Sequence, residues 1–206
     1  IAVFEDIKTE DREIFVCHKS KNDILELVTF LERNIAFDEW HVSFNGLGFD
    51  SQITEHVLRN KKQLLAQDGD TIAKFIYRKA QDIIYRQNNG EFLEFSPRDL
   101  QIRQVDVFKL NHWDNPAKRS SLKWIQFSMD WANIQDMPIH HTTQIETQEQ
   151  INEITSYCIN DVRSTKEIMK LSKSQIDLRR ALTEEYNIDL FSASEPKISK
   201  ELFLYF

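Results

Sequence analysis

Short strand-like segments alternate along this chain with longer segments whose apolar residues recur at helical spacing. Residues 40–44 alternate like a strand, and a helical region follows over about residues 51–85, with a break near residues 68–70. The next pair is a strand candidate at residues 105–110 and a helix at residues 121–127. This order of strand, helix, strand, helix is typical of a layered α/β domain.

The beginning of the chain predicts a hairpin followed by a helix. Residues 1–4 and 13–18 are rich in β-branched and aromatic side chains, and the polar residues 9–12 between them suggest a turn. Asn22-Asp23 then precede an apolar stripe at helical spacing. We expect this helix to run to about Asn34.

After the second strand and helix the pattern becomes helical. Thr147 and Gln150 match a capping box at the start of a long apolar stripe. Residues 194–197 read as a linker, and the apolar end of the sequence suggests a fragment of a longer polypeptide. We therefore predict one domain over residues 1–190, with a linker and the start of a following segment over residues 191–206.

Composition limits the class of protein. The 206 residues are 41% hydrophobic and include only 4 Gly and 4 Pro, which predicts one ordered domain with a well-filled core. We find no membrane-length apolar run and no export signal, and the two cysteines, Cys17 and Cys158, are too few for a disulfide framework. A soluble protein of a reducing cytoplasm is expected. The net charge of −7 argues against a generally basic nucleic-acid-binding surface but allows local basic patches.

Three carboxylates far apart in the sequence suggest a metal site. Asp6 follows the first apolar segment, Asp50 lies at a strand-to-helix junction, and Asp161 stands one helical turn after Tyr157 on the same side of a helix. Hard divalent cations bind oxygen ligands, and a fold can bring distant aspartates to one point. A metal-dependent nuclease is therefore the leading hypothesis.

With these residues, the chain resembles the 3′-to-5′ proofreading exonuclease domain of family B DNA polymerases, and phage versions most of all. This family belongs to the DEDD exonuclease superfamily, and the resemblance covers roughly residues 1–190. The order and spacing of the motif residues match those of the family. These residues are Asp6, Asn45-x-x-x-Phe49-Asp50 and Tyr157-x-x-x-Asp161.

The resemblance implies an RNase H-like fold, with a mixed central sheet flanked by helices and a helical C-terminal part. It implies two Mg²⁺ or Mn²⁺ ions held by Asp6, Asp50 and Asp161, and a Tyr157 phenol that orients the attacking water. Asn45 and Phe49 would then lie near the substrate. The expected partners are the 3′ end of single-stranded DNA and a polymerase domain in the same longer chain, in the host cytoplasm if a phage encodes it.

Lys8 departs from the family pattern. Strand periodicity places Asp6 and Lys8 on one face and Glu5 on the other, so Lys8 takes the position of the family's metal-facing Glu. Three interpretations remain: a degenerate site with weak activity, a variant in which Glu5 or Glu10 contributes after a local bulge, or a lysine that contacts the 3′-terminal nucleotide. Two other functions also stay open, a non-catalytic nucleic-acid-binding module and an RNA-trimming exonuclease.

Several other polar residues have less specific interpretations. The basic cluster Lys118-Arg119 with Lys123 and Trp124 could contact phosphate and stack a base, or could be a solvated charged face. His140-His141 are adjacent, so their rings cannot share one helical face, which favours a loop over a metal site. Asp106, at the start of an apolar segment, matches no motif residue of the family.

Overall fold

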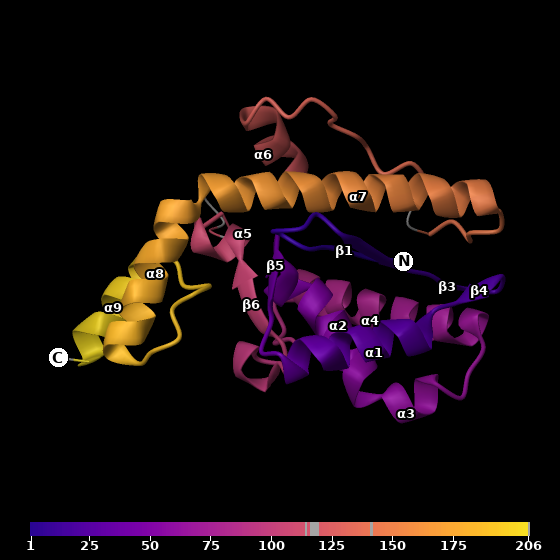
Figure 1. The fold of residues 1–206 in the computed structure, drawn as a ribbon, viewed down its shortest axis with the longest axis horizontal. Helices are drawn as coiled ribbons and strands as arrows, with labels where there is room; N and C mark the ends of the chain where they lie inside the picture. Colours follow the sequence, from indigo (N-terminus) through magenta and orange to yellow (C-terminus); the bar gives the residue numbers. More distant parts are fainter. Residues whose placement is uncertain (114, 116–119, 141, 206) are drawn as a thin grey trace. The chain divides into compact units, whose positions relative to one another are not determined.

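The chain forms two compact units, which are described separately here (Figure 1). Unit 1 consists of residues 1–14 and 107–206, and unit 2 of residues 15–106. Both strands and helices are present, so the predicted α/β class is confirmed. The structure is a computed structural model, and it describes residues 1–113, 115, 120–140 and 142–205.

Unit 2 contains a parallel strand pair, β5 (Trp40–Ser43) and β6 (Arg103–Asp106), with Ser43 opposite Asp106. Parallel strands need a long crossover connection, and here helices supply it. The strand predicted at residues 40–44 is confirmed as β5. The remaining elements of the unit are β3 (Cys17–His18), β4 (Lys21–Asn22), α1 (Ile24–Ala36), η1 (Gly46–Gly48), α2 (Asp50–Arg59), α3 (Lys61–Leu64), α4 (Gly69–Asn88) and η2 (Pro97–Asp99).

The helices of unit 2 follow from their sequence patterns. The helix predicted from Asn22-Asp23 is confirmed as α1, whose buried residues recur at helical spacing. The predicted break near residues 68–70 is also confirmed, because Asp68 caps α4 by accepting a hydrogen bond from the Thr71 amide. The core includes Leu27, Val28, Leu31, Val57, Leu58, Leu64, Ile72, Ile83 and Val105.

Unit 1 combines the strand pair at the start of the chain with helices from its second half. The strands β1 (Ala2–Glu5) and β2 (Arg12–Phe15) pair with each other, and β1 packs against α7. In Figure 1, α7 is the long orange helix, with α6 against it. The helices are α5 (Val107–Leu110), α6 (Leu122–Ser128), α7 (Gln148–Leu171), α8 (Lys173–Tyr186) and α9 (Glu195–Tyr205).

The long helix α7 begins where the sequence predicts. Thr147 and Gln150 form a complete capping box, in which each side chain accepts a hydrogen bond from the other residue's backbone amide. Ile151 and Ile168 bury the apolar stripe. The helix predicted at residues 121–127 is confirmed as α6, which Ser121 caps.

Two strand predictions are wrong in their extent. The first strand ends at Glu5, and Asp6 and Lys8 lie after it, so strand periodicity does not relate these two residues. The strand expected at residues 105–110 ends at Asp106 and continues as the single turn α5. A short apolar run does not distinguish a strand from a buried helical turn, and the chain buries most of α5 as a helix.

The described strands pair in small sheets. They form three two-stranded sheets, β1 with β2, β3 with β4, and β5 with β6. The RNase H-like arrangement with one central sheet therefore stays a prediction. None of the helices in the described ranges is long and apolar enough to cross a membrane. Neither Cys17 nor Cys158 takes part in a disulfide.

The C-terminal residues are helical in the structure. The sequence predicts a linker at residues 194–197, but residues 195–197 form the first turn of α9, which packs on α8 through an apolar cluster. Arg179 of α8 is fully buried, and its guanidinium donates hydrogen bonds to the carbonyl oxygens of Leu110, Gln175 and Ala193. These bonds tie α5 and the segment before α9 to α8. The apolar cluster consists of Leu182, Ile188, Leu190, Ala193, Ile198 and Leu202.

Candidate functional site

Tyr157 and Asp161 lie one turn apart on α7, as their spacing predicts. Burial raises the pKa of the Tyr157 phenol to about 12, and the neighbouring Asp161 carboxylate adds to the shift. Burial also raises the pKa of Asp161, although hydrogen bonds from Tyr157 and Gln126 oppose this effect. The phenol therefore keeps its proton at neutral pH and can act as a hydrogen-bond donor.

Gln126 fixes the Asp161 carboxylate from α6. Its side chain is 1% exposed, and its Nε2 donates to Asp161 Oδ1 at 3.2 Å and to Ser164 Oγ at 2.8 Å. The Ser164 hydroxyl donates in turn to the Asp161 carbonyl oxygen at 3.0 Å. Gln126 matches no motif and no cap in the sequence. Its only signal is an amide within a short, mostly apolar helix.

A second contact joins the segment after α6 to α7. The indole Nε1 of Trp131 donates to Asn160 Oδ1 at 3.0 Å, next in sequence to Asp161. Asn160 is buried, and its Nδ2 has no hydrogen-bond partner among the described residues. Together with Gln126, Trp131 anchors the segment containing α6 on the face of α7 that carries Asp161.

Asp6 lies in the turn that joins β1 and β2. Its Oδ1 accepts hydrogen bonds from the backbone amides of Lys8 and Thr9, both at 2.7 Å. The backbone of Asp6 closes the turn through its amide to the Asp11 carbonyl oxygen, and through its carbonyl oxygen to the Glu10 amide. The bonds from Thr9 and Lys8 lower the pKa of the exposed Asp6 carboxyl. Asp6 is therefore ionised and one of its oxygens is fixed by the turn.

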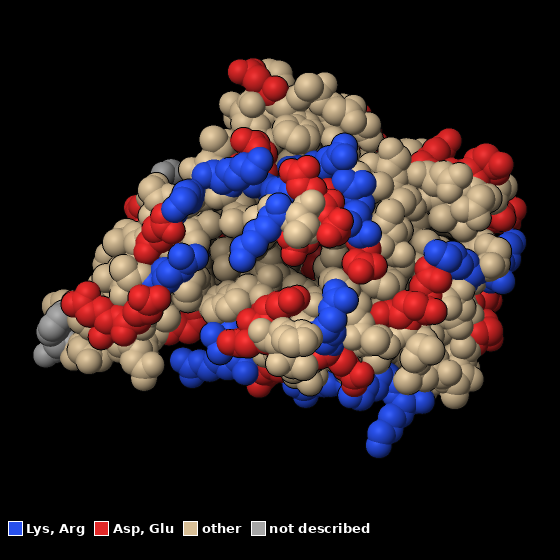
Figure 2. Space-filling view, in the orientation of Figure 1, with Lys and Arg blue, Asp and Glu red and all other residues tan. Residues whose placement is uncertain are grey.

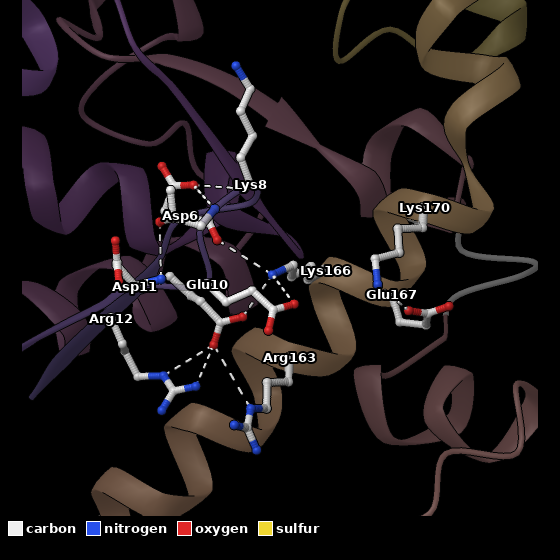
Figure 3. Close-up of polar contacts among 11 residues, drawn as sticks. Asp6, Lys8, Glu10, Asp11, Arg12, Arg163, Lys166, Glu167 and Lys170 are labelled. Carbon is white, nitrogen blue, oxygen red and sulfur yellow. Dashed lines mark hydrogen bonds and ion pairs between the residues drawn. The ribbon is translucent and has the colours of Figure 1, made fainter.

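An ion-pair network joins this hairpin to α7 (Figure 3). Glu5 is 4% exposed in its side chain and pairs with Arg12 at 2.6 Å, Lys166 at 3.1 Å and, more distantly, Arg163 at 3.9 Å. Lys166 also pairs with Glu10 at 3.3 Å. Glu5 and Glu10, which flank Asp6 in sequence, are thus paired with cations, and two of these cations, Arg163 and Lys166, lie on α7.

The network explains the acidity of Glu5. Burial raises its pKa, but hydrogen bonds and charges from Arg12 and Lys166 outweigh burial and hold the pKa below its usual value of 4.5. These contacts contribute stability above about pH 4.5, and that contribution is lost as the pH falls through the lowered pKa. At neutral pH, Glu5 and Glu10 serve Lys166 as counter-ions. The Lys8 side chain extends away from the network in Figure 3.

Replacing Lys166 by Met should destabilise unit 1. The change leaves the buried Glu5 carboxylate with fewer donors, at an expected cost of about 1–3 kcal/mol in the free energy of unfolding. Urea unfolding measures this cost. The control is Lys170→Met on the same helix, because Lys170 forms an exposed pair with Glu167, and we expect a change within about 0.5 kcal/mol. Equal effects of the two substitutions would contradict the structural role of Lys166.

In unit 2, a buried carboxylate shapes the loop between β5 and α2. Asp106 at the end of β6 is 0% exposed, and its two oxygens accept hydrogen bonds from the Asn45 amide at 2.9 Å and the Leu47 amide at 3.1 Å. Asn45 has a left-handed backbone with φ of 60°, which asparagine tolerates better than most residues. Asp106 therefore positions the loop. Sequence reasoning found no role for it, because Asp106 reads as the start of the apolar run at residues 105–110 and not as the end of the strand RQVD.

The same loop is held from two further sides. Gln87 Nε2 donates to the Gly48 carbonyl oxygen at 2.7 Å, and Gln52 Nε2 donates to the Leu47 carbonyl oxygen at 3.3 Å. At Gly46 a Cβ atom would lie 1.9 Å from the Ser43 hydroxyl oxygen, so only glycine fits there. Side chains of Asp106, Gln87 and Gln52 thus hold the loop where it leads into α2. It delivers a half-buried Phe49 and an exposed Asp50, the first residue of that helix.

The structure distributes the predicted site residues over both units. Unit 1 holds Asp6, Lys8, Tyr157 and Asp161, and unit 2 holds Asn45, Phe49 and Asp50. Within unit 1, the strand before Asp6 packs on the helix of Asp161. Searching the described residues finds no group of three or more His, Cys, Asp or Glu side chains arranged to hold a metal ion.

The remaining polar residues of the sequence analysis do not form a recognisable ligand set. His140 Nδ1 lies 2.7 Å from the Thr142 hydroxyl oxygen. His141, Lys118 and Arg119 lie outside the described residues. Acidic and basic side chains are interspersed on the face shown in Figure 2, with no extended basic surface there.

Comparison of the chain with protein-family models, with curated proteins and with solved structures finds no match.

Proposed function

We propose that this chain is a 3′-to-5′ exonuclease that removes nucleotides from single-stranded or frayed DNA ends, as the RNase H-like proofreading part of a DNA polymerase. The observation that supports this most is the Tyr157–Asp161 pair, which Gln126 fixes from a second helix. An ionised aspartate, Asp6, lies in the same unit on a hairpin that packs against the helix of that pair.

The aspartates fit the role of ligands for Mg²⁺ or Mn²⁺. Hydrogen bonds from the protein fix the Oδ1 atom of Asp6 and that of Asp161. Carboxylates that bind metal ions are commonly oriented by such supporting hydrogen bonds. The family pattern assigns the third ligand to Asp50, which lies in unit 2. Two such ions, when bound, would activate a water molecule and neutralise the charge that develops on the departing 3′ oxygen.

In this proposal Tyr157 orients the attacking water molecule and does not abstract a proton from it. A phenol with a pKa of about 12 stays protonated at neutral pH, so it is a donor and not a general base. Its hydroxyl donates to the Asp161 carboxylate, and its oxygen can accept a hydrogen bond from a water molecule in line with the terminal phosphodiester. Replacing Tyr157 by Phe would therefore reduce turnover more than metal binding.

The test is a cleavage assay with a 5′-labelled single-stranded DNA oligonucleotide, Mg²⁺ or Mn²⁺, and the whole chain beside Lys8→Glu. We expect products that shorten one nucleotide at a time from the 3′ end, that require the metal, and that form slowly from a matched duplex. Asp50→Asn should remove the activity. If neither the chain nor Lys8→Glu shortens the strand, the proposal is wrong.

One observation favours a second candidate, a non-catalytic nucleic-acid-binding module. Glu5 and Glu10 are both paired with Lys166, so neither is a ready substitute for the carboxylate that the family has at the position of Lys8. Calorimetry with Mn²⁺ and a short oligonucleotide separates the two candidates. Two metal sites favour the exonuclease, and oligonucleotide binding without metal uptake favours the module.

A further inference from the structure

Two large aromatic side chains lie exposed and stacked on α6. Trp124 is 59% and Phe127 64% exposed, and their ring centroids are 5.8 Å apart with an interplanar angle of 26°. Residues three apart share one face of a helix, so the two rings form one continuous apolar surface. The surface over α6 in Figure 2 consists mainly of uncharged side chains.

The opposite side of α6 is fixed to the candidate site. Gln126 lies between the two aromatic residues in sequence, but its buried side chain contacts Asp161 and Ser164 of α7. Trp131, three residues beyond the end of α6, is hydrogen-bonded to Asn160. The exposed aromatic surface is therefore part of a segment that is anchored on α7 beside Asp161.

The chemistry of this surface matches nucleobases. Bases stack on exposed aromatic rings whatever their sequence, and nearly parallel rings offer flat faces for stacking. Lys123 in the same helix pairs with Asp136, which is itself 86% exposed in its side chain. Such a surface ion pair is weak, so a phosphate group can replace the carboxylate. An apolar protein partner would not need a cation at this place.

We infer that Trp124 and Phe127 form a stacking platform for the bases of a single strand whose 3′ end lies at Asp161. The inference deepens the proposed function and rests on it for the direction of the strand. Stacking supplies the affinity and Lys123 a phosphate contact, so binding tolerates any base sequence but requires bases. Paired strands do not bind, because their bases are already stacked on one another.

The experiment measures binding without cleavage. A 5′-fluorescein-labelled oligothymidylate is titrated with the whole chain in EDTA, and anisotropy gives Kd for a normal strand and for one with abasic positions. The variant Trp124→Leu/Phe127→Leu keeps the surface apolar but removes both rings. The matched control is Phe92→Leu, since Phe92 is a 95% exposed aromatic residue of unit 2. Circular dichroism checks that each variant is folded.

We expect the double variant to weaken binding of the normal strand by about tenfold or more and to bind normal and abasic strands alike. Phe92→Leu should leave Kd unchanged, and Trp124→Phe should restore most of the affinity lost in Trp124→Leu. Equal Kd values for the chain and the double variant would overturn the inference, as would a chain that does not bind the strand. Self-association of the chain that the double variant abolishes would also overturn it, because the surface would then contact protein.

The experiments distinguish failure of the stacking platform from failure of the proposed exonuclease activity. A chain that binds through the platform but never shortens the strand in Mn²⁺ keeps the platform and loses the exonuclease. A chain that shortens the strand while the double variant binds equally well keeps the exonuclease and loses the platform.

Discussion

In the proposed exonuclease, Asp161→Asn should lower the rate of 3′ nucleotide removal about a thousandfold, equivalent to ~4 kcal/mol in the activation barrier, because a neutral amide replaces the carboxylate proposed to bind metal. The fold should survive, since the amide oxygen can still accept the Gln126 hydrogen bond. Single-turnover cleavage of a 5′-labelled strand in Mn²⁺ measures the rate.

Stability distinguishes this loss from unfolding. Burial raises the pKa of Asp161, so its ionised form opposes folding; this penalty grows as the pH rises from the ordinary value of 3.8 to the raised pKa, and it is fully present at higher pH. The variant should therefore be at least as stable as the parent chain in urea. Asp177→Asn, at an exposed position on α8, is the matched control and should leave the rate unchanged. Cleavage by Asp161→Asn within tenfold of the parent rate would remove Asp161 from the chemistry.

The second large effect is expected in unit 2. Asp106→Ala leaves the buried amides of Asn45 and Leu47 without their acceptors, at an expected cost of about 3 kcal/mol in the free energy of unfolding. It should also loosen the loop that delivers Asp50, and so reduce cleavage. Urea unfolding measures the first effect, and hydrogen exchange at the two amides measures the second.

Asp70→Ala is the control for this substitution. Asp70 lies in the same unit, but its carboxylate pairs with Lys74 at the exposed start of α4, so its loss should cost less than about 0.5 kcal/mol. Fast exchange at Asn45 and Leu47 in Asp106→Ala, with slow exchange in Asp70→Ala, is the expected pattern. Protected amides in both variants would show that Asp106 does not hold the loop.

Local patterns predicted the helices well. The starts of α6 and α7 follow from capping side chains, and α1 follows from its apolar stripe, all of them features that lie within a few residues of each other in sequence. The placement of Tyr157 and Asp161 on one side of α7 follows from helical periodicity alone. These features need no knowledge of what the helix packs against.

Contacts between distant residues could not be predicted in this way. Asp106 and Asn45 are 61 residues apart, and Gln126 and Asp161 are 35 apart, so no periodic pattern connects the partners. Gln126 in particular looks like any other polar residue of a short helix. Its role arises only from the packing of α6 on α7.

The end of the first strand shows the limit of periodicity. Strand alternation relates Asp6 to Lys8 only while the strand continues, but the Asp6 carboxylate binds the amides that follow it and closes a turn. The carboxylates that pair with α7 are instead those of Glu5 and Glu10, and their ammonium partner is Lys166. The hydrogen bonds of the Asp6 carboxylate to nearby backbone amides thus end the strand, and the alternation expected from spacing does not continue to Lys8.

The pair formed by Glu5 and Lys166 also bears on how the chain folds during synthesis. Its members are 161 residues apart, so the amino-terminal hairpin leaves the ribosome long before its helical partner exists. Residues 15–106, which form the whole of unit 2, are synthesised before α7 and can fold while the hairpin still lacks its helical partner. Closing so large a loop is slow. The hairpin's apolar side chains are therefore exposed to chaperones and proteases during this delay.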